Sequence, residues 1–459
     1  MADSLQQFDL LIRNGQMVTA YGERRADIGV KDGKIVAIES DLGGEARRVI
    51  DAAGWLVLPG VIDPHTHMGI PIKDTTSADD FASGSEAAAC GGVTTIFDFT
   101  VQEKGQSLKE ALEVRLQKAR DRCSVDYGIH VNVTDAPERW LEQIPELIAA
   151  GFRSFKVFST YREAGMMVTW EQFRRILQQV HAHGGLLLLH AEDNALVESQ
   201  TAANVNAGRL APIYHARSRT AEAEAKAVKQ AAEIAGELGA RLYIVHLSSR
   251  AGLEAGLRAR EQGVDILLET CPQYLLLDES KYRQPNGHYF ITTPPLRTRD
   301  DAEALWQALR DGHIDTVGTD HCPFTRAQKE SGSGKFHLTP NGLPGVETLL
   351  PLLYTYGVAE GRIALPRLVQ VLAKRTAEIF GLTDRKGDIR VGADADLVIW
   401  NPNEETAIAA ENLHGQADWS PYEGMRIAGR VEYTLLRGQV LVEQGEFVGE
   451  RGKGELLRR

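Results

Sequence analysis

The sequence predicts an α/β protein: a (β/α)8 barrel with a small β-sandwich domain built from both ends of the chain. Between residues 58 and 383, short apolar stretches alternate with helical patterns whose apolar residues recur every three or four positions. Outside that range, alternating strands are separated by glycine turns such as Asn14-Gly15 and Asp32-Gly33. Strand and helix units repeated eight times are typical of a closed, TIM-like parallel barrel.

The strand predictions place the carboxyl end of each barrel strand. The eight predicted strands end near Asp63, Phe99, Val133, Phe158, His190, His246, Thr270 and Thr319. Helices are predicted for residues 107–122, 137–150, 170–183, 220–238, 251–262 and 300–311. Residues 331–344 are rich in Gly, Ser and Pro, and we expect them to form a loop over the barrel mouth.

The small domain is predicted from residues 1–57 and 384–459, and the barrel from residues 58–383. A sheet from either chain end alone is too small to bury both of its faces, so each end needs the other. We therefore expect the two ends to pair with one another.

Composition restricts the partners and the location. The formal net charge of −12 disfavours nucleic acid and anionic membranes, which attract clustered Lys and Arg. No apolar run approaches the roughly 18 residues that span a bilayer, and the N-terminus lacks a signal-peptide pattern. Four widely spaced cysteines suggest reduced thiols. These features predict a cytoplasmic protein without nucleic-acid or membrane partners.

Two histidines directly after the first barrel strand point to a metal site. Side chains two positions apart in a strand project to the same side, so His65 and His67 lie about 7 Å apart. Neutral imidazoles at that spacing can share one metal ion. Alternatively, His65 and His67 are two polar residues on a solvated strand end, but further candidate metal ligands downstream disfavour this interpretation.

Those further candidates lie at other strand ends. His190 ends strand 5, His246 ends strand 6 and Asp320 follows strand 8, so a barrel brings all three to the same mouth. Lys156 lies among apolar residues of strand 4, where an unpaired ammonium is costly. Either its deprotonated amine captures carbon dioxide as a carbamate that bridges two cations, or the lysine pairs with a nearby Asp or Glu.

Eight motifs in order resemble the cyclic amidohydrolases of the dihydropyrimidinase and hydantoinase branch, over nearly the whole chain. They are 59–67 (PGVIDPHTH), 154–161 (SFKVFSTY), 189–192 (LHAE), 243–248 (YIVHLS), 269–275 (ETCPQYL), 294–297 (PPLR), 318–322 (GTDHC) and 340–345 (PNGLPG). The resemblance implies hydrolytic ring opening of a dihydropyrimidine or 5-substituted hydantoin to an N-carbamoyl amino acid.

The resemblance also implies a site. Two divalent metal ions, expected to be zinc, would be bridged by carbamylated Lys156. One would take His65, His67 and Asp320, and the other His190 and His246. Asp320 would act as the catalytic base, and Tyr161 would stabilise the oxyanion. Thr293, where the family has serine, and Asn341 would hold the substrate amide through backbone groups. Members of this family usually form homotetramers or homodimers, so the resemblance implies a homo-oligomer.

Alternative functions remain at this stage. An allantoinase-like ureide hydrolase would use the same site, a non-catalytic scaffold of the dihydropyrimidinase-related type would bind no metal, and a deaminase-like relative would bind one ion. Related dihydroorotases carry an arginine where Gly69 stands, and Met68, Ile70, Pro71, Ile72 and Phe158 suggest an apolar pocket. We therefore expect a neutral ring substituent, with dihydroorotate a poor substrate.

Overall fold

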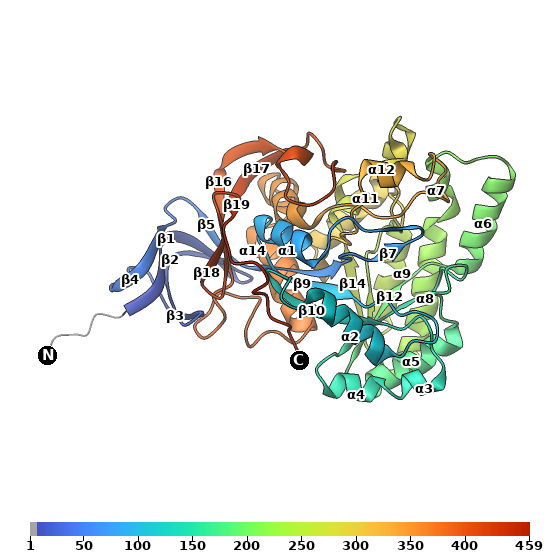
Figure 1. Ribbon diagram of the computed structural model, residues 1–459, viewed down its shortest axis with the longest axis horizontal. Helices are drawn as coiled ribbons and strands as arrows, with labels where there is room; N and C mark the ends of the chain where they lie inside the picture. The colour runs from blue at the N-terminus through green and yellow to red at the C-terminus, as the bar shows by residue number, and fades with distance from the viewer. Residues whose placement is uncertain (1–6) are drawn as a thin grey trace.

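The computed structural model describes residues 7–459, which form a barrel and a separate sheet lying beside it (Figure 1). The barrel contains eight parallel strands, adjacent in chain order. They are β6 (Val61–Thr66), β9 (Val93–Phe99), β10 (Asp126–Asn132), β11 (Ser154–Phe158), β12 (Leu186–His190), β13 (Leu242–Ile244), β14 (Ile266–Thr270) and β15 (Thr316–Val317). The predicted barrel is therefore confirmed, strand by strand.

The first and last strands close the barrel through the residues that follow β15. Thr66 and His321 form a parallel bridge, and the His67 N–H donates to the His321 carbonyl over 2.8 Å. This closure matters for the site, because it draws the segment after β15 against the His65–His67 segment.

Helices surround the barrel. The α-helices are α1 (Phe81–Cys90), α2 (Leu108–Ala119), α3 (Glu138–Leu141), α4 (Ile144–Ala149), α5 (Trp170–Ala182), α6 (Asn194–Asn206), α7 (Ile213–Ser218), α8 (Ala221–Leu238), α9 (Arg250–Glu261), α10 (Pro272–Leu276), α11 (Arg299–Arg310), α12 (Arg326–Glu330), α13 (Leu349–Leu353), α14 (Leu365–Val369) and α15 (Arg375–Ile379). Shorter turns are η1 (Glu279–Arg283), η2 (Gly287–Phe290), η3 (Val346–Thr348) and η6 (Ala410–Asn412), and two π-helical segments are η4 (Tyr354–Ala359) and η5 (Gln370–Lys374).

One predicted helix differs from the structure. Residues 137–150 form two short helices, α3 and α4, with Pro145 in the first turn of the second. Proline has no backbone N–H and is tolerated only at a helix start, so it begins a new helix here. The amphipathic pattern is otherwise sound: in α5, Phe173, Ile176 and Val180 are buried.

The second sheet joins the two ends of the chain, as predicted. Its nine strands are β1 (Gln7–Thr19), β2 (Gly22–Lys31), β3 (Lys34–Glu39), β4 (Glu45–Asp51), β5 (Leu56–Pro59), β16 (Leu397–Ala407), β17 (Arg426–Leu436), β18 (Gln439–Glu443) and β19 (Glu446–Phe447). β5 pairs antiparallel with β16, with Val57 opposite Ile399. Residues from both chain ends, including Ile28 and Leu435, pack in one apolar core.

The chain passes from the sheet to the barrel at Gly60, between β5 and β6. A side chain there would clash with Thr94, whose Oγ1 would lie 2.1 Å from the added Cβ. We propose Gly60 as the division between the two domains, two residues after the predicted limit. At the other end, Leu457 packs with Phe97 and Phe380 under the barrel.

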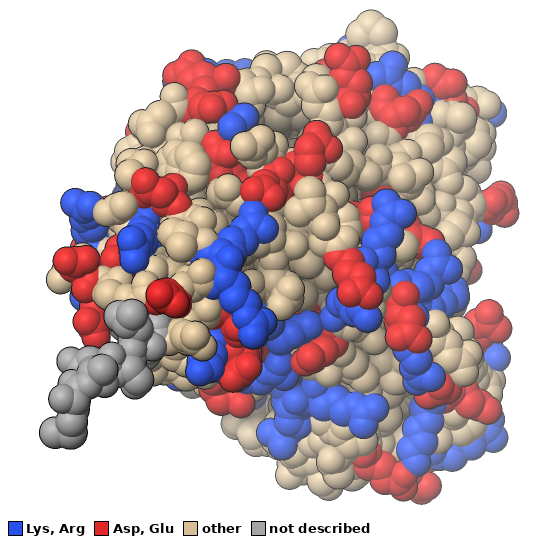
Figure 2. Space-filling view, turned by 60° about the vertical axis from the view of Figure 1, so that its left-hand side comes forward, with Lys and Arg blue, Asp and Glu red and all other residues tan. Residues whose placement is uncertain are grey.

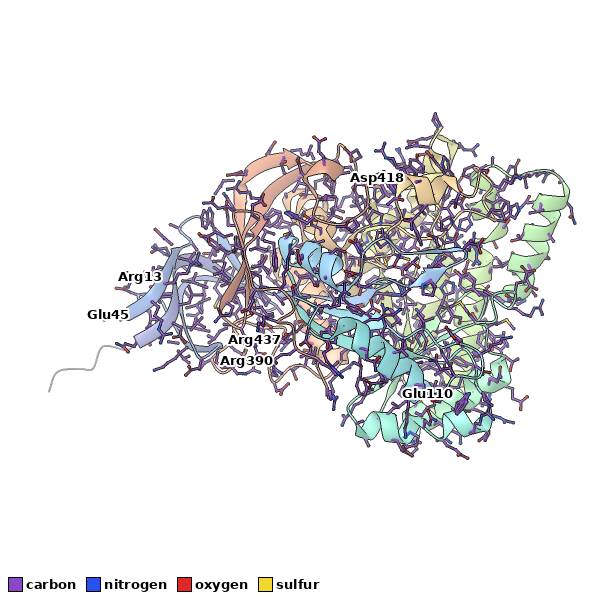
Figure 3. The ribbon with its side chains drawn as sticks, viewed as in Figure 1. Arg13, Glu45, Glu110, Arg390, Asp418 and Arg437 are labelled. Atoms are coloured by element: carbon purple, nitrogen blue, oxygen red, sulfur yellow. The ribbon has the colours of Figure 1, made fainter. Side chains whose placement is uncertain are left out.

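A buried ion-pair cluster fixes the sheet against the barrel. Lys386 Nζ lies 2.7 Å from Asp126 of β10 and also contacts Asp396. Arg437, which is labelled in Figure 3 and directly follows β17, contacts Asp126 as well. Three aspartates of this cluster lie close enough together to hold a metal ion: Asp126, Asp394 and Asp396. Each of them already forms an ion pair, Asp394 with Arg385 and the other two with Lys386.

On the surface, Lys and Arg are interspersed with Asp and Glu across the face drawn in Figure 2. Within residues 7–459, no helix combines the length and apolar character needed to cross a membrane.

Candidate metal centre and active site

A cavity of about 430 Å³ opens at the carboxyl ends of the barrel strands. All the residues predicted for the site line it: His65, His67, Lys156, Tyr161, His190, His246, Thr293, Asp320 and Asn341. They come from the ends of β6, β11, β12 and β13 and from the loops after β14 and β15. Parallel closure therefore brings together side chains up to 276 residues apart in sequence (65 to 341).

The first group of potential metal ligands is formed by His65, His67 and Asp320, whose donor atoms all lie within 4.8 Å of one another. Asp320 Oδ1 lies 3.0 Å from His67 Nε2 and 3.3 Å from His65 Nε2. Two imidazoles and one carboxylate converging on one point form a donor set that suits a divalent transition metal.

His190 and His246 form a second group beside the first. His190 Nδ1 lies 2.9 Å from His246 Nε2, and the His246 and His65 rings are 5.3 Å apart. Burial holds the pKa of His65, His190 and His246 below the ordinary value, so all three imidazoles are neutral. His65 Nε2, which lies 3.3 Å from Asp320 Oδ1, is buried without a hydrogen-bond partner and is therefore free to bind a metal ion.

Lys156 lies between aromatic rings and is 1% exposed. Its Nζ is 4.8 Å from the Phe99 ring centroid and 5.3 Å from that of Phe158. No ion pair among residues 7–459 includes Lys156, which disfavours the simple reading of a salt-bridged lysine. Burial lowers its pKa to about 8, with Asp320 and Glu269 partly offsetting that effect. A substantial fraction of neutral, nucleophilic amine therefore exists near neutral pH.

Two buried glutamates orient the histidines. Glu269, at the end of β14, accepts from His65 Nδ1 over 2.7 Å and from the His246 backbone N–H over 2.9 Å. Burial raises its pKa to about 8. Glu192 contacts His190 Nε2 over 2.7 Å and forms an ion pair with Arg219. Such carboxylates fix the tautomer and direction of a ligating imidazole.

Sequence reasoning assigned no role to either glutamate. The available signal was weak: Glu192 stands two positions after His190, and Glu269 lies within a strand end. Their function depends on contacts across neighbouring strands.

Three site residues adopt left-handed backbone conformations, which are costly for residues other than glycine. The φ angles are 68° at Tyr161, 40° at His246 and 53° at Asp320. Each lies two or three residues after the end of a barrel strand and lines the cavity, and strain of this kind concentrates at functional sites.

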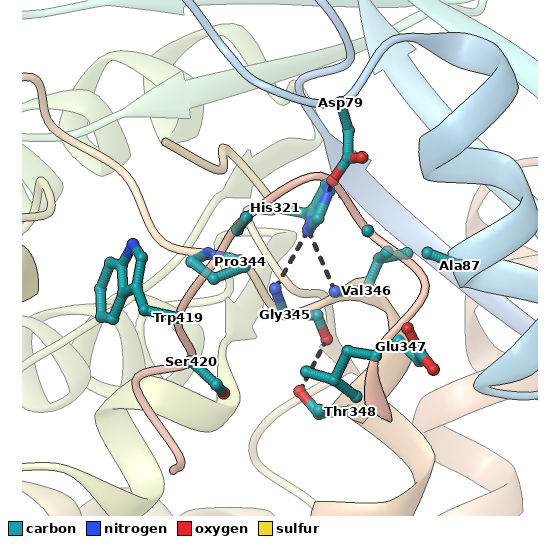
Figure 4. Close-up of a pocket in the computed structure, with 13 residues that line it drawn as sticks. Asp79, Ala87, His321, Pro344, Gly345, Val346, Glu347, Thr348, Trp419 and Ser420 are labelled. Carbon is teal, nitrogen blue, oxygen red and sulfur yellow. Dashed lines mark hydrogen bonds and ion pairs between the residues drawn. The ribbon is translucent and has the colours of Figure 1, made fainter. Parts of the chain in front are cut away.

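The segment that carries Asp320 is held on both sides. Asp63 accepts from the Thr319 N–H over 3.0 Å, and burial raises the pKa of Asp63 to about 6. On the other side, His321 Nε2 donates to Asp79 over 3.1 Å. His321 Nδ1 accepts from the backbone N–H groups of Gly345 and Val346, as Figure 4 shows. His321 thus points away from the cavity and supports the segment that carries Asp320.

Tyr161 lines the cavity, and the Arg219 guanidinium lies over its ring, 4.8 Å from the ring centroid. Burial raises the pKa of Tyr161 to about 12, so its hydroxyl keeps its proton. Asn341 lies across the cavity, and its Oδ1 is buried without a partner.

Lys329 joins the segments that carry Thr293 and Asn341. Its fully buried amino group donates to the Ile291 carbonyl over 2.8 Å and to the Pro340 carbonyl over 2.9 Å, and burial lowers its pKa well below the ordinary value. His215 adds a bond to the Thr292 carbonyl over 2.7 Å. Neither residue was predicted to matter, because a sequence does not reveal which carbonyls a buried lysine or histidine will bind.

The wall beyond the ligands corrects one expectation. Ile70, Pro71, Ile72 and Phe158 line the cavity as predicted, but Met68 is buried against α1 instead. The wall also includes Lys73, so this loop does supply a cation. The expectation of a neutral ring substituent stays a prediction, and Lys73 is a feature that it did not take into account.

Residues 56–441 match the model of the Amidohydrolase family. A D-hydantoinase from Ralstonia pickettii is 42% identical over 98% of this chain and 99% of its own length. Among solved structures, a dihydropyrimidinase from Brevibacillus agri NCHU1002 has a TM-score of 0.96 at 39% identity, covering 98% of both chains. An L-hydantoinase (dihydropyrimidinase) from Arthrobacter aurescens has a TM-score of 0.91 at 32% identity, covering 98% of this chain and all of that one (100%).

Proposed function

Because the chain belongs to the Amidohydrolase family, we propose that it hydrolyses a cyclic amide, a dihydropyrimidine or a 5-substituted hydantoin, to an N-carbamoyl amino acid. The observation that carries the proposal is the pairing of two groups of metal-ligand donors, His65–His67–Asp320 and His190–His246, at one barrel mouth beside an unpaired buried lysine.

The donors fit two divalent ions. His65, His67 and Asp320 would hold one, and His190 and His246 the other, with zinc the expected metal for this nitrogen and oxygen set. Carbamylated Lys156 would contribute an oxygen to each ion, because a carbamate is a carboxylate carried at the end of a long side chain. When bound, such ions lower the pKa of a water molecule and polarise the ring carbonyl.

Asp320 is placed to move the proton. It accepts a proton from the attacking water as the water oxygen adds to the ring carbonyl carbon. It then delivers that proton to the ring nitrogen as the carbon–nitrogen bond breaks. The second proton of the water leaves the new carboxyl group for solvent. The products are therefore a carboxylate and an open-chain ureido group on the same molecule, together with one released proton, so atoms and charges balance.

Tyr161 stabilises the negative charge that develops on the carbonyl oxygen. Because burial raises its pKa to about 12, the phenol remains a hydrogen-bond donor at any pH at which the enzyme would work. Backbone groups of Thr293 and Asn341 would hold the ring amide, and Lys329 keeps their segments in register.

The test combines an activity panel with metal analysis. Dihydrouracil, D- and L-monosubstituted hydantoins and allantoin are assayed side by side, and metal per chain is measured by mass spectrometry. Ring opening of dihydrouracil or hydantoins with about two metal ions per chain is expected. Allantoin as the best substrate would favour an allantoinase-like enzyme. A protein with no turnover and no bound metal would favour the non-catalytic scaffold. One metal ion per chain would favour a deaminase-like relative.

A homo-oligomer, tetramer or dimer, is part of the same proposal. Light scattering on the purified protein tests it, and a monomeric mass with full activity would contradict it.

A further inference from the structure

We propose that the substituent subsite of this cavity accepts ring substituents that end in a carboxylate, with Lys73 as the binding cation. The inference rests on the proposed function, because it names a class of cyclic amide for the same site. It reverses the expectation of a neutral substituent, and it depends on the position of Lys73 and the wall that leads to it.

Lys73 lies at the tip of a short hairpin over the cavity. β7 (Pro71–Ile72) and β8 (Thr75–Thr76) pair antiparallel, leaving Lys73 and Asp74 as the two-residue turn. Lys73 has a φ of 53°, the left-handed value that such tight hairpin turns require. The hairpin follows the metal-ligand segment directly, so the turn holds Lys73 in the cavity lining.

The charge of Lys73 is not neutralised where it lies. Its ammonium donates to the carbonyls of His337, over 3.0 Å, and Thr339, which belong to the loop predicted to cover the mouth. Both partners are neutral, and an ammonium has three donors. No carboxylate among residues 7–459 forms an ion pair with Lys73, although Asp74 is its neighbour in sequence. One donor and a net positive charge therefore remain for a ligand.

An apolar wall connects the reacting end to this cation. Ile70, Ile72 and Phe158 line one part of it, and Ala164 and Met166 line another. Methylene groups of a substituent would replace water along these side chains, which favours burial.

A substituent with a short hydrocarbon stem and an anionic end fits these features: an apolar path followed by positive charge.

The test compares two hydantoins of nearly equal shape, one with a carboxyethyl and one with a carbamoylethyl substituent. The chains assayed are wild type, Lys73→Met and Lys335→Met. Methionine keeps the length of the side chain and removes its charge. Lys335 is an exposed lysine of the mouth loop that does not line the cavity, so its variant controls for the overall charge.

For wild type and Lys335→Met, we expect kcat/KM to be about fivefold higher for the carboxylate, the size of a solvent-exposed charge interaction. Lys73→Met should remove this preference while retaining activity on the carboxamide. If Lys73→Met lowers kcat/KM equally for both compounds, Lys73 only fastens the hairpin to the loop, and the inference is overturned. A wild type that prefers the carboxamide overturns it as well.

A binding measurement separates this inference from the proposed function. Calorimetry with the two ring-opened N-carbamoyl amino acids reads the same preference without turnover. Tighter binding of the compound whose substituent ends in a carboxylate, seen in the wild type and lost in Lys73→Met, supports the subsite. This result would support the subsite even if the protein opens no ring, and only the proposed function would then fail. Equal affinities in both chains overturn the subsite.

Discussion

Replacing Lys156 by methionine should abolish activity and, at the same time, stabilise the metal-free protein. The ammonium of Lys156 is buried between Phe99 and Phe158 without an ion pair, so the folded protein bears the cost of desolvating it. Methionine has a similar length and no charge. It removes that cost, but it also removes the amine on which a carbamate would form.

The size of the stabilisation follows from the pKa. Burial lowers the pKa of Lys156 to about 8 from an ordinary value of 10.5, which corresponds to about 3 kcal/mol of folding free energy at neutral pH. Between pH 8 and pH 10.5, Lys156 binds a proton in the unfolded chain but not in the folded chain. The wild type therefore gains stability as the pH rises, so the advantage of Lys156→Met is full below pH 8 and fades toward pH 10.5.

The assay is thermal unfolding of chelator-treated protein at pH 7 and at pH 10. At about 2 cal/mol/K of unfolding entropy per residue, the expected gain is roughly 3 °C at pH 7. The matched control is Lys386→Met, another buried lysine, which is paired with Asp126 and Asp396. That variant should lose about 3–5 kcal/mol, because it leaves buried Asp396 without a cation and removes one of the two cations that contact Asp126.

A metal-free Lys156→Met that unfolds at a lower temperature than metal-free wild type would refute the reasoning. So would normal turnover with two bound metal ions per chain, since methionine offers no oxygen to bridge them.

Three further variants test other parts of the site. Asp320→Asn should lower kcat by about 10³-fold with an unchanged fold by circular dichroism, because an amide cannot accept the proton, and near-normal turnover would remove Asp320 from this role. Tyr161→Phe should lower kcat by about 10²-fold or more with metal content unchanged, and a change confined to KM would argue against oxyanion stabilisation. Lys329→Met should raise KM by about tenfold with metal content unchanged, because the Ile291 and Pro340 carbonyls lose their hydrogen-bond donor. Loss of metal from this variant would show that the structural change reaches the metal ligands.

Much of the fold could be predicted because barrel strands and helices have local signatures. The buried strands β9 to β12 are short and apolar, and helices such as α5 repeat apolar residues with the helical period. Placing metal-ligand residues at the carboxyl ends of parallel strands then required only the general geometry of a barrel. The split of residues 137–150 into two helices does not show in the apolar periodicity, because Pro145 interrupts the backbone hydrogen bonds without changing the spacing of the apolar residues.

By itself, the sequence determined the barrel, the pairing of the two chain ends and the histidines, Lys156 and Asp320 that meet at one cavity, because strand order and barrel geometry set where the strand ends lie. Tyr161, Thr293 and Asn341 were implied by the family resemblance instead. Only the tertiary structure decided which groups hold that set in place. Glu269 reaches His65 and His246 from β14, and Lys73 meets a loop more than 260 residues away, His337 being 264 positions on. Such contacts depend on the closure of the barrel and the path of its loops, and neither leaves a periodic pattern in the chain.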